Sequence, residues 1–180
     1  MTAPLLFKVV DGVGEIVLNR PDAGNAFDEP MLDAWVEALQ QCHADDAVRA
    51  VLLRANGRHF CAGGDLHDMK RELEGPPSIH KDKLWSGVHR IPRLMMQIDK
   101  PVVAAMQGAA TGAGLDMALQ CDFRVAADNA RVAASYVKIG LVPDAGGTWF
   151  IPSLIGKARA THWMMSGEPL SAETAADWGL

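Results

Sequence analysis

The chain has 180 residues, with 17 Lys and Arg against 22 Asp and Glu, a net charge of −5 and a hydrophobic content of 49%. This is the composition of an ordinary globular domain, so disordered, collagen-like and coiled-coil chains are excluded. The acidic balance provides no basic field for a polyanion, and we expect no nucleic-acid partner.

Three cysteines, Cys42, Cys61 and Cys121, form no CxxC pair and lie in apolar stretches. Such an odd, dispersed set suits a reducing compartment, so we predict a cytoplasmic protein. The N-terminal residues contain no basic leader followed by a long apolar run. No segment of the sequence approaches eighteen uninterrupted apolar residues. We therefore expect neither export nor a membrane-spanning segment.

The N-terminal half alternates between strand and helix patterns. Residues Phe7 to Leu18 alternate around Asp11-Gly12, which predicts an antiparallel hairpin. Glu29 to Cys42 has helical spacing of apolar residues, with Asp28 as the N-cap. The short apolar runs AVLLRA (50–55) and PVVAAMQG (101–108) predict strands buried on both faces.

Between those two strands the sequence predicts a loop, a break and a helix. The loop contains glycines and is followed by a charged stretch over 67–74 and the GPPS break at 75–78. The next helix is indicated by apolar residues at helical spacing, namely Leu84, Val88, Ile91, Met95 and Ile98.

The C-terminal half begins with GAATGAGLDMALQCD, which passes from a strand into a helix through a tight turn. Two short strands, in CDFRVAA and ARVAASY, precede a cluster of glycines over 140–147 and a helical tail in which a last helix begins at Ser171. The pattern predicts one α/β domain over 1–180. The chain ends at Gly179-Leu180, where another element is expected, so we predict that a C-terminal part is missing.

Two stretches share a design in which an apolar strand runs through glycines directly into a helix. They are FCAGGDL (60–66) and GAATGAGLD (108–116). Backbone N–H groups at a helix N-terminus lack intrahelical partners and can bind an anion or a developing oxyanion. If the N–H groups of Gly64 and Ala113 converge, they form an oxyanion hole. Small residues that merely allow close packing are the alternative explanation.

The stretches IVLNRPDAGNAF, AVLLRANGRHFCAGGDL, PVVAAMQGAATGAGLDMALQCDFRVAA and KIGLVPDAGGTW, followed by LSAETAADWGL, extend over essentially the whole chain. Together they resemble the enoyl-CoA hydratase/isomerase family, also called the crotonase superfamily. The resemblance implies a spiral of ββα units, a coenzyme A thioester substrate and an oxyanion hole at Gly64 and Ala113. It also implies a homotrimer or a dimer of trimers, in which further C-terminal helices complete the assembly.

The same resemblance implies which residues bind the substrate. They are Asn25, Ala26, Ala62, Gly64, Asp65, Leu66, Gly112 and Tyr136. No cofactor is expected, because coenzyme A is part of the substrate.

Two aspartates are the candidates for acid and base. Hydratases of the family resemble one another in placing glutamates at the positions of Asp116 and Tyr136, and a phenol is a poor general base at neutral pH. The sequence therefore argues against hydration by a pair of carboxylates. KIGLVPDAGGTW instead resembles the members that isomerise 2-(1,2-epoxy-1,2-dihydrophenyl)acetyl-CoA, in which the residue matching Asp144 moves the proton.

Each of these side chains also has a structural interpretation. Asp116 lies in a first helical turn, where the helix dipole favours a carboxylate, and Asp144 lies in a turn context. Asp65 is expected to be an N-cap that steadies the turn presenting Gly64. Tyr136 is expected to line the acyl pocket with a hydroxyl that needs a partner.

Other chemistries lack their minimum motifs. The six histidines have no metal-ligand spacing, so no metal site is predicted. Gly112-Ala-Gly114 lacks the third glycine of a dinucleotide motif, so NAD is rejected. The leading hypothesis is an acyl-CoA isomerase or hydratase that uses Asp144, Asp116 or both, and the sequence favours isomerisation. The alternatives are a trans-2-enoyl-CoA hydratase and a non-catalytic CoA-binding family member.

Overall fold

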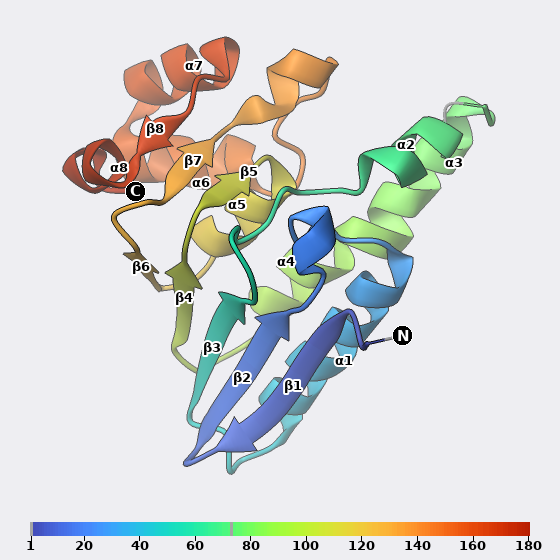
Figure 1. Ribbon diagram of the computed structural model, residues 1–180, viewed down its shortest axis with the longest axis vertical. Helices are drawn as coiled ribbons and strands as arrows, with labels where there is room; N and C mark the ends of the chain where they lie inside the picture. The colour runs from blue at the N-terminus through green and yellow to red at the C-terminus, as the bar shows by residue number, and fades with distance from the viewer. Residues whose placement is uncertain (1, 73) are drawn as a thin grey trace.

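The computed structural model describes residues 2–72 and 74–180, whose strands form two sheets (Figure 1). The strands are β1 (Leu5–Val10), β2 (Val13–Leu18), β3 (Ala50–Ala55), β4 (Val102–Met106), β5 (Ala109–Thr111), β6 (Phe123–Ala126), β7 (Arg131–Ala133) and β8 (Leu170–Ser171). The larger sheet has the order β1-β2-β3-β4-β6, and the smaller has the order β5-β7-β8. β1 is antiparallel to β2, whereas β2, β3, β4 and β6 run parallel. The predicted α/β class is confirmed.

The helices lie around the two sheets. They are α1 (Glu29–Ala44), α2 (Leu66–Glu72), α3 (Pro77–Lys83), α4 (Arg90–Met95), α5 (Ala113–Leu119), α6 (Gly147–Ile155), α7 (Lys157–Ser166) and α8 (Ala172–Trp178), with 3-10 turns η1 (Pro21–Ala23) and η3 (Ser135–Ile139) and a π-helix η2 (Leu84–Val88). In Figure 1, α2 and α3 project to one side of the larger sheet, and α6, α7 and α8 lie beside the smaller sheet. Among the described residues, no helix combines the length and the apolar character needed to cross a membrane.

The predicted N-terminal hairpin is confirmed. Asp11 and Gly12 both have positive φ values, 52° and 83°, as a tight two-residue hairpin turn requires. Lys8 and Glu15 face each other across the two strands and form an ion pair of 2.8 Å. The local sequence thus sets the register of the first two strands.

The predicted helix α1 is also confirmed and forms one layer of the core. Asp28 caps it by accepting a hydrogen bond of 3.0 Å from the Met31 N–H. Its buried residues recur at helical spacing and pack with β1, β2 and α4; they are Met31, Leu32, Trp35, Val36, Ala38, Leu39 and Cys42.

The strands β3 and β4 differ from the prediction that both of their faces are buried. Val51, Leu53 and Ala55 of β3 are buried, but the alternate positions are only half-buried. β4 shows the same alternation. One face of β3 and β4 therefore belongs to the core, whereas the other face is packed less completely.

The helix predicted around Leu84 to Ile98 is divided in the structure. Residues 84–88 form the π-helix η2, in which the His89 N–H donates to the Leu84 carbonyl at 2.8 Å. α4 then ends at Met95, so Ile98 lies beyond it. Pro92 explains the break because it has no N–H group to continue a regular ladder.

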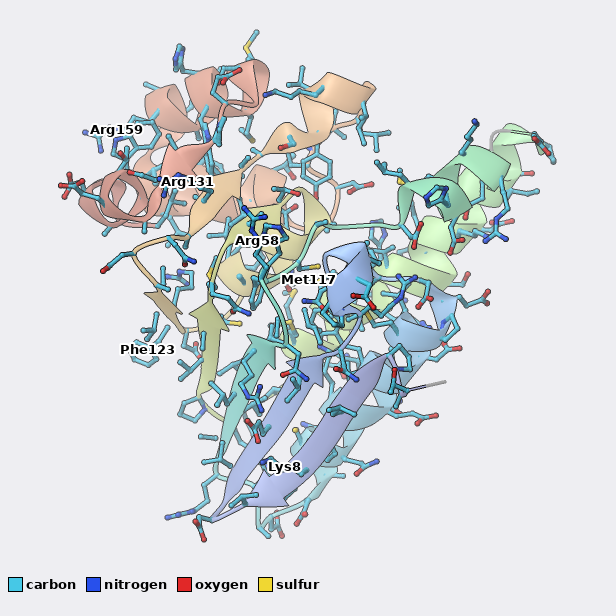
Figure 2. The ribbon with its side chains drawn as sticks, viewed as in Figure 1. Lys8, Arg58, Met117, Phe123, Arg131 and Arg159 are labelled. Atoms are coloured by element: carbon cyan, nitrogen blue, oxygen red, sulfur yellow. The ribbon has the colours of Figure 1, made fainter. Side chains whose placement is uncertain are left out.

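The C-terminal half contains the elements that the sequence predicted. The predicted passage from strand β5 to helix α5 is confirmed, as are the strands β6 and β7. Met117 of α5 is fully buried, whereas Phe123 on the edge strand β6 is 63% exposed (Figure 2). The expected helix start at Ser171 is confirmed, because its hydroxyl accepts a hydrogen bond of 3.1 Å from the Thr174 N–H.

Loss of this cap should destabilise the protein. We expect Ser171→Ala to lower the free energy of unfolding by about 1 kcal/mol, because the Thr174 N–H loses its acceptor. The matched control is Ser153→Ala on α6, where an exposed hydroxyl only donates back to the Trp149 carbonyl. Its effect should stay within about 0.5 kcal/mol. Urea denaturation of both variants measures the difference, and equal effects would contradict the capping role.

Candidate active site

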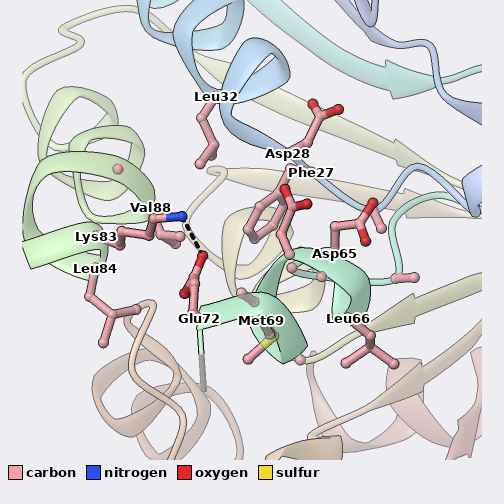
Figure 3. A pocket seen from close by; sticks show the side chains of 18 of the residues that line it. Phe27, Asp28, Leu32, Asp65, Leu66, Met69, Glu72, Lys83, Leu84 and Val88 are labelled. Atoms are coloured by element: carbon pink, nitrogen blue, oxygen red, sulfur yellow. Dashed lines mark hydrogen bonds and ion pairs between the residues drawn. The ribbon is translucent and has the colours of Figure 1, made fainter. Parts of the chain in front are cut away.

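A cavity of about 1230 Å³ lies where the loop before α2, the turn before α5 and the helices α1, η2 and η3 meet. Figure 3 shows its apolar wall, to which Phe27, Leu32, Met69, Leu84 and Val88 contribute side chains. An ion pair of 2.6 Å between Glu72 and Lys83 spans from α2 to α3 on this wall. The cavity lining combines these apolar side chains with many charged ones, and a large concave cavity is the usual form of a small-molecule site.

Two backbone turns also line the cavity. The Thr111 N–H donates to the Cys61 carbonyl at 2.9 Å, and the Thr111 hydroxyl donates to the Ala62 carbonyl at 3.1 Å. A Cβ on Gly63 would lie 3.5 Å from the Ala113 nitrogen. The loop before α2 and the turn before α5 therefore converge, as the sequence analysis required for a shared site.

The close approach of the two turns depends on glycine. A Cβ at Gly114 would lie 2.7 Å from the Cys61 carbonyl oxygen, a separation that real side chains do not tolerate. Gly63 has a φ of +91°, which disfavours other residues. The small-residue pattern therefore serves the close packing of the two turns.

The N–H groups of Gly64 and Ala113 are unpaired within the described part of the chain. Both residues line the cavity. Ala113 is the first residue of α5, so its N–H is one of the helix donors that has no intrahelical partner.

Asp144 supplies a carboxyl group to the same cavity. It lies in the loop between η3 and α6 and is half-buried. Burial raises the pKa of Asp144 above its usual value, while the hydrogen bond from its own backbone and the charge of His89 act in the opposite direction. Its raised pKa brings this carboxyl group closer to the range that suits a general acid or base at neutral pH.

Asp116 is placed differently, because it is fully buried and does not line the cavity. Its Oδ2 accepts hydrogen bonds from the Tyr136 hydroxyl at 2.7 Å and from the Gly147 N–H at 2.9 Å. Its Oδ1 is buried without a partner. Burial raises the pKa of Asp116 to about 6, although the bonds from Tyr136 and Gly147 favour its charged form.

Tyr136 separates Asp116 from the cavity. Its ring is buried and lines the cavity, as the sequence analysis expected, and its hydroxyl finds the buried partner that such a group needs. Burial and the neighbouring carboxyl groups raise the pKa of Tyr136 above its usual range. The phenol is therefore neutral at physiological pH.

The loop before α2 is held by polar side chains. Asp65 Oδ1 accepts a hydrogen bond of 2.9 Å from the His67 N–H at the start of α2, the capping geometry expected of it. Asp65 also forms an ion pair of 3.0 Å with Arg20, which in turn lies 3.2 Å from Asp28. Partial burial would raise the pKa of Asp65, but the His67 N–H and Arg20 lower it further than burial raises it.

Asn25 does not line the cavity, although the sequence analysis placed it among the substrate-binding residues. It is fully buried with a positive φ of 55°. Its amide donates to the carbonyls of Asn56 and His59 at 2.9 and 2.8 Å, and its oxygen accepts from the Arg20 N–H. Asn25 thus ties loops together beneath the site instead of facing a ligand.

The structure brings together nearly all of the residues that the sequence analysis selected. All of them except Asn25 and Asp116 line the one cavity: Ala26, Ala62, Gly64, Asp65, Leu66, Gly112, Ala113, Tyr136 and Asp144. The sequence analysis missed Arg20 and Gly147. The Arg20-Pro pair lies within the quoted motif, but only the fold shows that Arg20 reaches Asp65. Within residues 2–72 and 74–180, no three His, Cys, Asp or Glu side chains form a candidate metal site.

Comparisons with known proteins give the family to which this fold belongs. The family model "Enoyl-CoA hydratase/isomerase" matches residues 8–180. A 1,2-epoxyphenylacetyl-CoA isomerase from Escherichia coli is 39% identical over 98% of this chain and 67% of its own length. A trans-2-decenoyl-[acyl-carrier-protein] isomerase from Streptococcus mutans is 36% identical with the same coverage.

Solved structures agree with this match. The crystal structure of an enoyl-CoA hydratase/isomerase from Cupriavidus metallidurans has a TM-score of 0.90 and 33% identity, and the match covers 98% of this chain and 65% of that one. The chain spans about two thirds of the length of such relatives. It belongs to the enoyl-CoA hydratase/isomerase family and is an enzyme of that family.

The raised pKa of Asp116 leads to a prediction about stability. Between the usual pKa of 3.8 and about 6, the folded protein binds more protons at Asp116 than the unfolded chain does. This contribution to the free energy of unfolding is present at pH 4 and is lost as the pH rises to 7, by up to about 3 kcal/mol. We therefore expect Asp116→Asn to gain stability relative to the wild type as the pH rises.

Denaturant unfolding at pH 4, 5, 6 and 7 measures this difference. Asp46→Asn, at an exposed position of the loop before β3, controls for the loss of one negative charge. A stability difference between Asp116→Asn and wild type that stays constant with pH would show that Asp116 keeps an ordinary pKa.

Proposed function

We propose that the protein is an acyl-CoA isomerase in which Gly64 and Ala113 bind the thioester oxygen and Asp144 moves the proton. One observation carries this proposal. Asp144, with its raised pKa, lines the same cavity as the two unpaired N–H groups, whereas Asp116 is buried behind Tyr136. A single carboxyl group and a polarised carbonyl are the parts that a double-bond shift requires.

The reaction follows from these positions. The C–H bond next to the thioester breaks, its proton moves to an Asp144 oxygen, and its electron pair forms an enolate. The Gly64 and Ala113 N–H groups stabilise the negative charge on the enolate oxygen. In a 3-enoyl thioester this enolate is conjugated with the C3–C4 double bond, so Asp144 returns the proton to C4 and the double bond moves to C2–C3 without gain or loss of mass.

The substrate class is part of the proposal. Similarity to the isomerase named for 1,2-epoxyphenylacetyl-CoA supports an aromatic epoxide-type or a 3-enoyl thioester, and the apolar wall of the cavity favours such acyl groups. The family resemblance also supports a homotrimer or dimer of trimers. A cytoplasmic location stays a prediction from the sequence.

Product analysis tests the reaction type. The protein is incubated separately with trans-2-enoyl-CoA, 3-enoyl-CoA and the aromatic epoxide-type thioester. The mass of each product is then measured by mass spectrometry. We expect a product of unchanged mass and altered retention, and Asp144→Asn should lower kcat by at least about 100-fold because the base is lost. Addition of one water would identify a hydratase, and tight binding without any product would identify a non-catalytic CoA-binding protein.

The oxyanion assignment has its own test. Ala113→Pro removes one N–H at the first residue of α5, a position where proline fits a helix. We expect kcat to fall by about 100- to 1000-fold, the usual effect of losing one such donor. Ala172→Pro makes the same change at the first residue of α8, away from the cavity, and should leave kcat unchanged. Equal activity of the two folded variants would contradict the assignment.

A further inference from the structure

Gln120, the C-cap residue of α5, uses its side-chain amide on two backbone carbonyls. Its Nε2 donates to the Ala145 carbonyl at 3.0 Å and to the Asp116 carbonyl at 3.4 Å. A carboxamide NH2 group has two hydrogens to donate, which matches the two acceptors. An aliphatic side chain or an ionised carboxylate at this position would offer neither carbonyl a donor.

The Ala145 carbonyl lies one residue beyond the carboxyl group proposed as the acid and base. Asp144 belongs to the loop between η3 and α6 (residues 140–146, the Asp144 loop). Ala145 is fully buried, so no water can replace a lost partner of its carbonyl. The hydrogen bond to the Asp144 carboxyl group comes from its own backbone. The place of this carboxyl group in the cavity therefore follows the backbone of the loop.

A second side chain of α5 holds the end of the same loop. Asp116 Oδ2 accepts the Gly147 N–H at 2.9 Å, where the loop passes into α6. A Cβ on Gly147 would lie 2.7 Å from this oxygen, so the backbone approaches α5 as closely as a glycine allows. Gly146, between the two anchored residues, has a φ of +112°, which favours glycine. Residues 145–147 are therefore fixed to α5 at both ends.

The same helix begins with the Ala113 N–H group. Every residue of α5 is buried, and the helix packs against α6 (Figure 1). The N–H proposed to bind the thioester oxygen and the two anchors of the Asp144 loop thus belong to one buried element. Such an element can fix the distance between two groups that act on one substrate, and a misplacement of about 1 Å can cost about 100-fold in rate.

We propose that Gln120 is a positioning residue, which holds the Ala145 carbonyl so that the Asp144 carboxyl group keeps its place relative to the Ala113 N–H. This inference rests on the proposed function. Gln120 does not line the cavity, so it acts only through the loop. Loss of its donors would leave the thioester oxygen bound but would let the acid and base move away from the carbon that loses its proton. The expected defect is therefore in proton transfer and not in binding.

Gln120→Met tests this role because methionine is similar in length and has no donor. Gln107→Met is the matched control. The Gln107 amide also donates to two backbone carbonyls, those of Ala55 and Gly57, at 2.9 and 3.1 Å, and Gln107 is half-buried like Gln120. Neither Gln107 nor its two acceptors line the cavity. The two variants thus lose the same kind of contact, but only one of them loses it beside Asp144.

The first experiment measures the anchoring itself and needs no catalysis. Hydrogen–deuterium exchange followed by mass spectrometry reports the protection of the peptide over residues 141–150, which contains the Gly147 N–H bonded to Asp116. We expect this peptide to exchange about fivefold faster in Gln120→Met than in the wild type, and at the wild-type rate in Gln107→Met. Unchanged exchange in folded Gln120→Met, or equal acceleration in both variants, would overturn the proposal.

The second experiment compares kcat and KM for the isomerisation of 3-enoyl-CoA. We expect Gln120→Met to lower kcat by at least about 10-fold and to change KM by less than about twofold, because only proton transfer is impaired. Gln107→Met should keep both constants. Adding Gln120→Met to Asp144→Asn should lower the residual kcat no further, since no base is left to position. Equal relative losses with and without Asp144 would show a structural role only.

Gln120→Ala covers the case in which Gln120→Met does not fold, because it removes the same donors without placing an apolar chain against the two carbonyls. Circular dichroism and thermal unfolding establish that each variant is folded. Asp144→Asn separates the two proposals. If it keeps the wild-type kcat, the proposed function fails and the positioning role fails with it. If it lowers kcat but the folded Gln120 variants do not, only the positioning role is overturned.

Discussion

The contact between the backbone of Cys61 and Thr111 is the constraint on which the rest of the site depends. Through it the loop before α2 and the turn before α5, some fifty residues apart in the sequence, lie side by side. The Gly114 position tolerates no Cβ because the Cys61 carbonyl is so close. Without this approach, the N–H groups of Gly64 and Ala113, which the proposed mechanism uses together, would belong to two separate turns.

Burial divides the two aspartates into different roles. Asp144 borders the cavity, whereas Asp116 lies behind Tyr136 with two donors on one oxygen. Both pKa values are raised by burial, so the pKa shifts alone would not distinguish a base from a supporting group. Access to the cavity distinguishes them, and it assigns the proton transfer to Asp144 in the proposed mechanism.

Local patterns predicted the elements that short-range physics controls. The Asp11-Gly12 turn, the Asp28 and Ser171 caps and the strand-to-helix passage at α5 depend on a few neighbouring residues, and each is found in the structure. The predictions failed where a distant partner or an interruption decides the outcome. Pro92 divides the expected helix into η2 and α4, and β3 and β4 are buried on one face and only half-buried on the other.

The sequence by itself determined the α/β class, the two glycine turns and, through the resemblance of its motifs to a family, nine of the residues that line the cavity. Motif order and local backbone preferences are written in consecutive residues. Only the tertiary structure decided the position of each side chain relative to the cavity. Asn25 points into the loops beneath the site, Asp116 is covered by Tyr136, and Arg20 reaches Asp65. These facts depend on which distant segments pack together, since burial and hydrogen-bond partners are properties of the folded chain and not of any one segment.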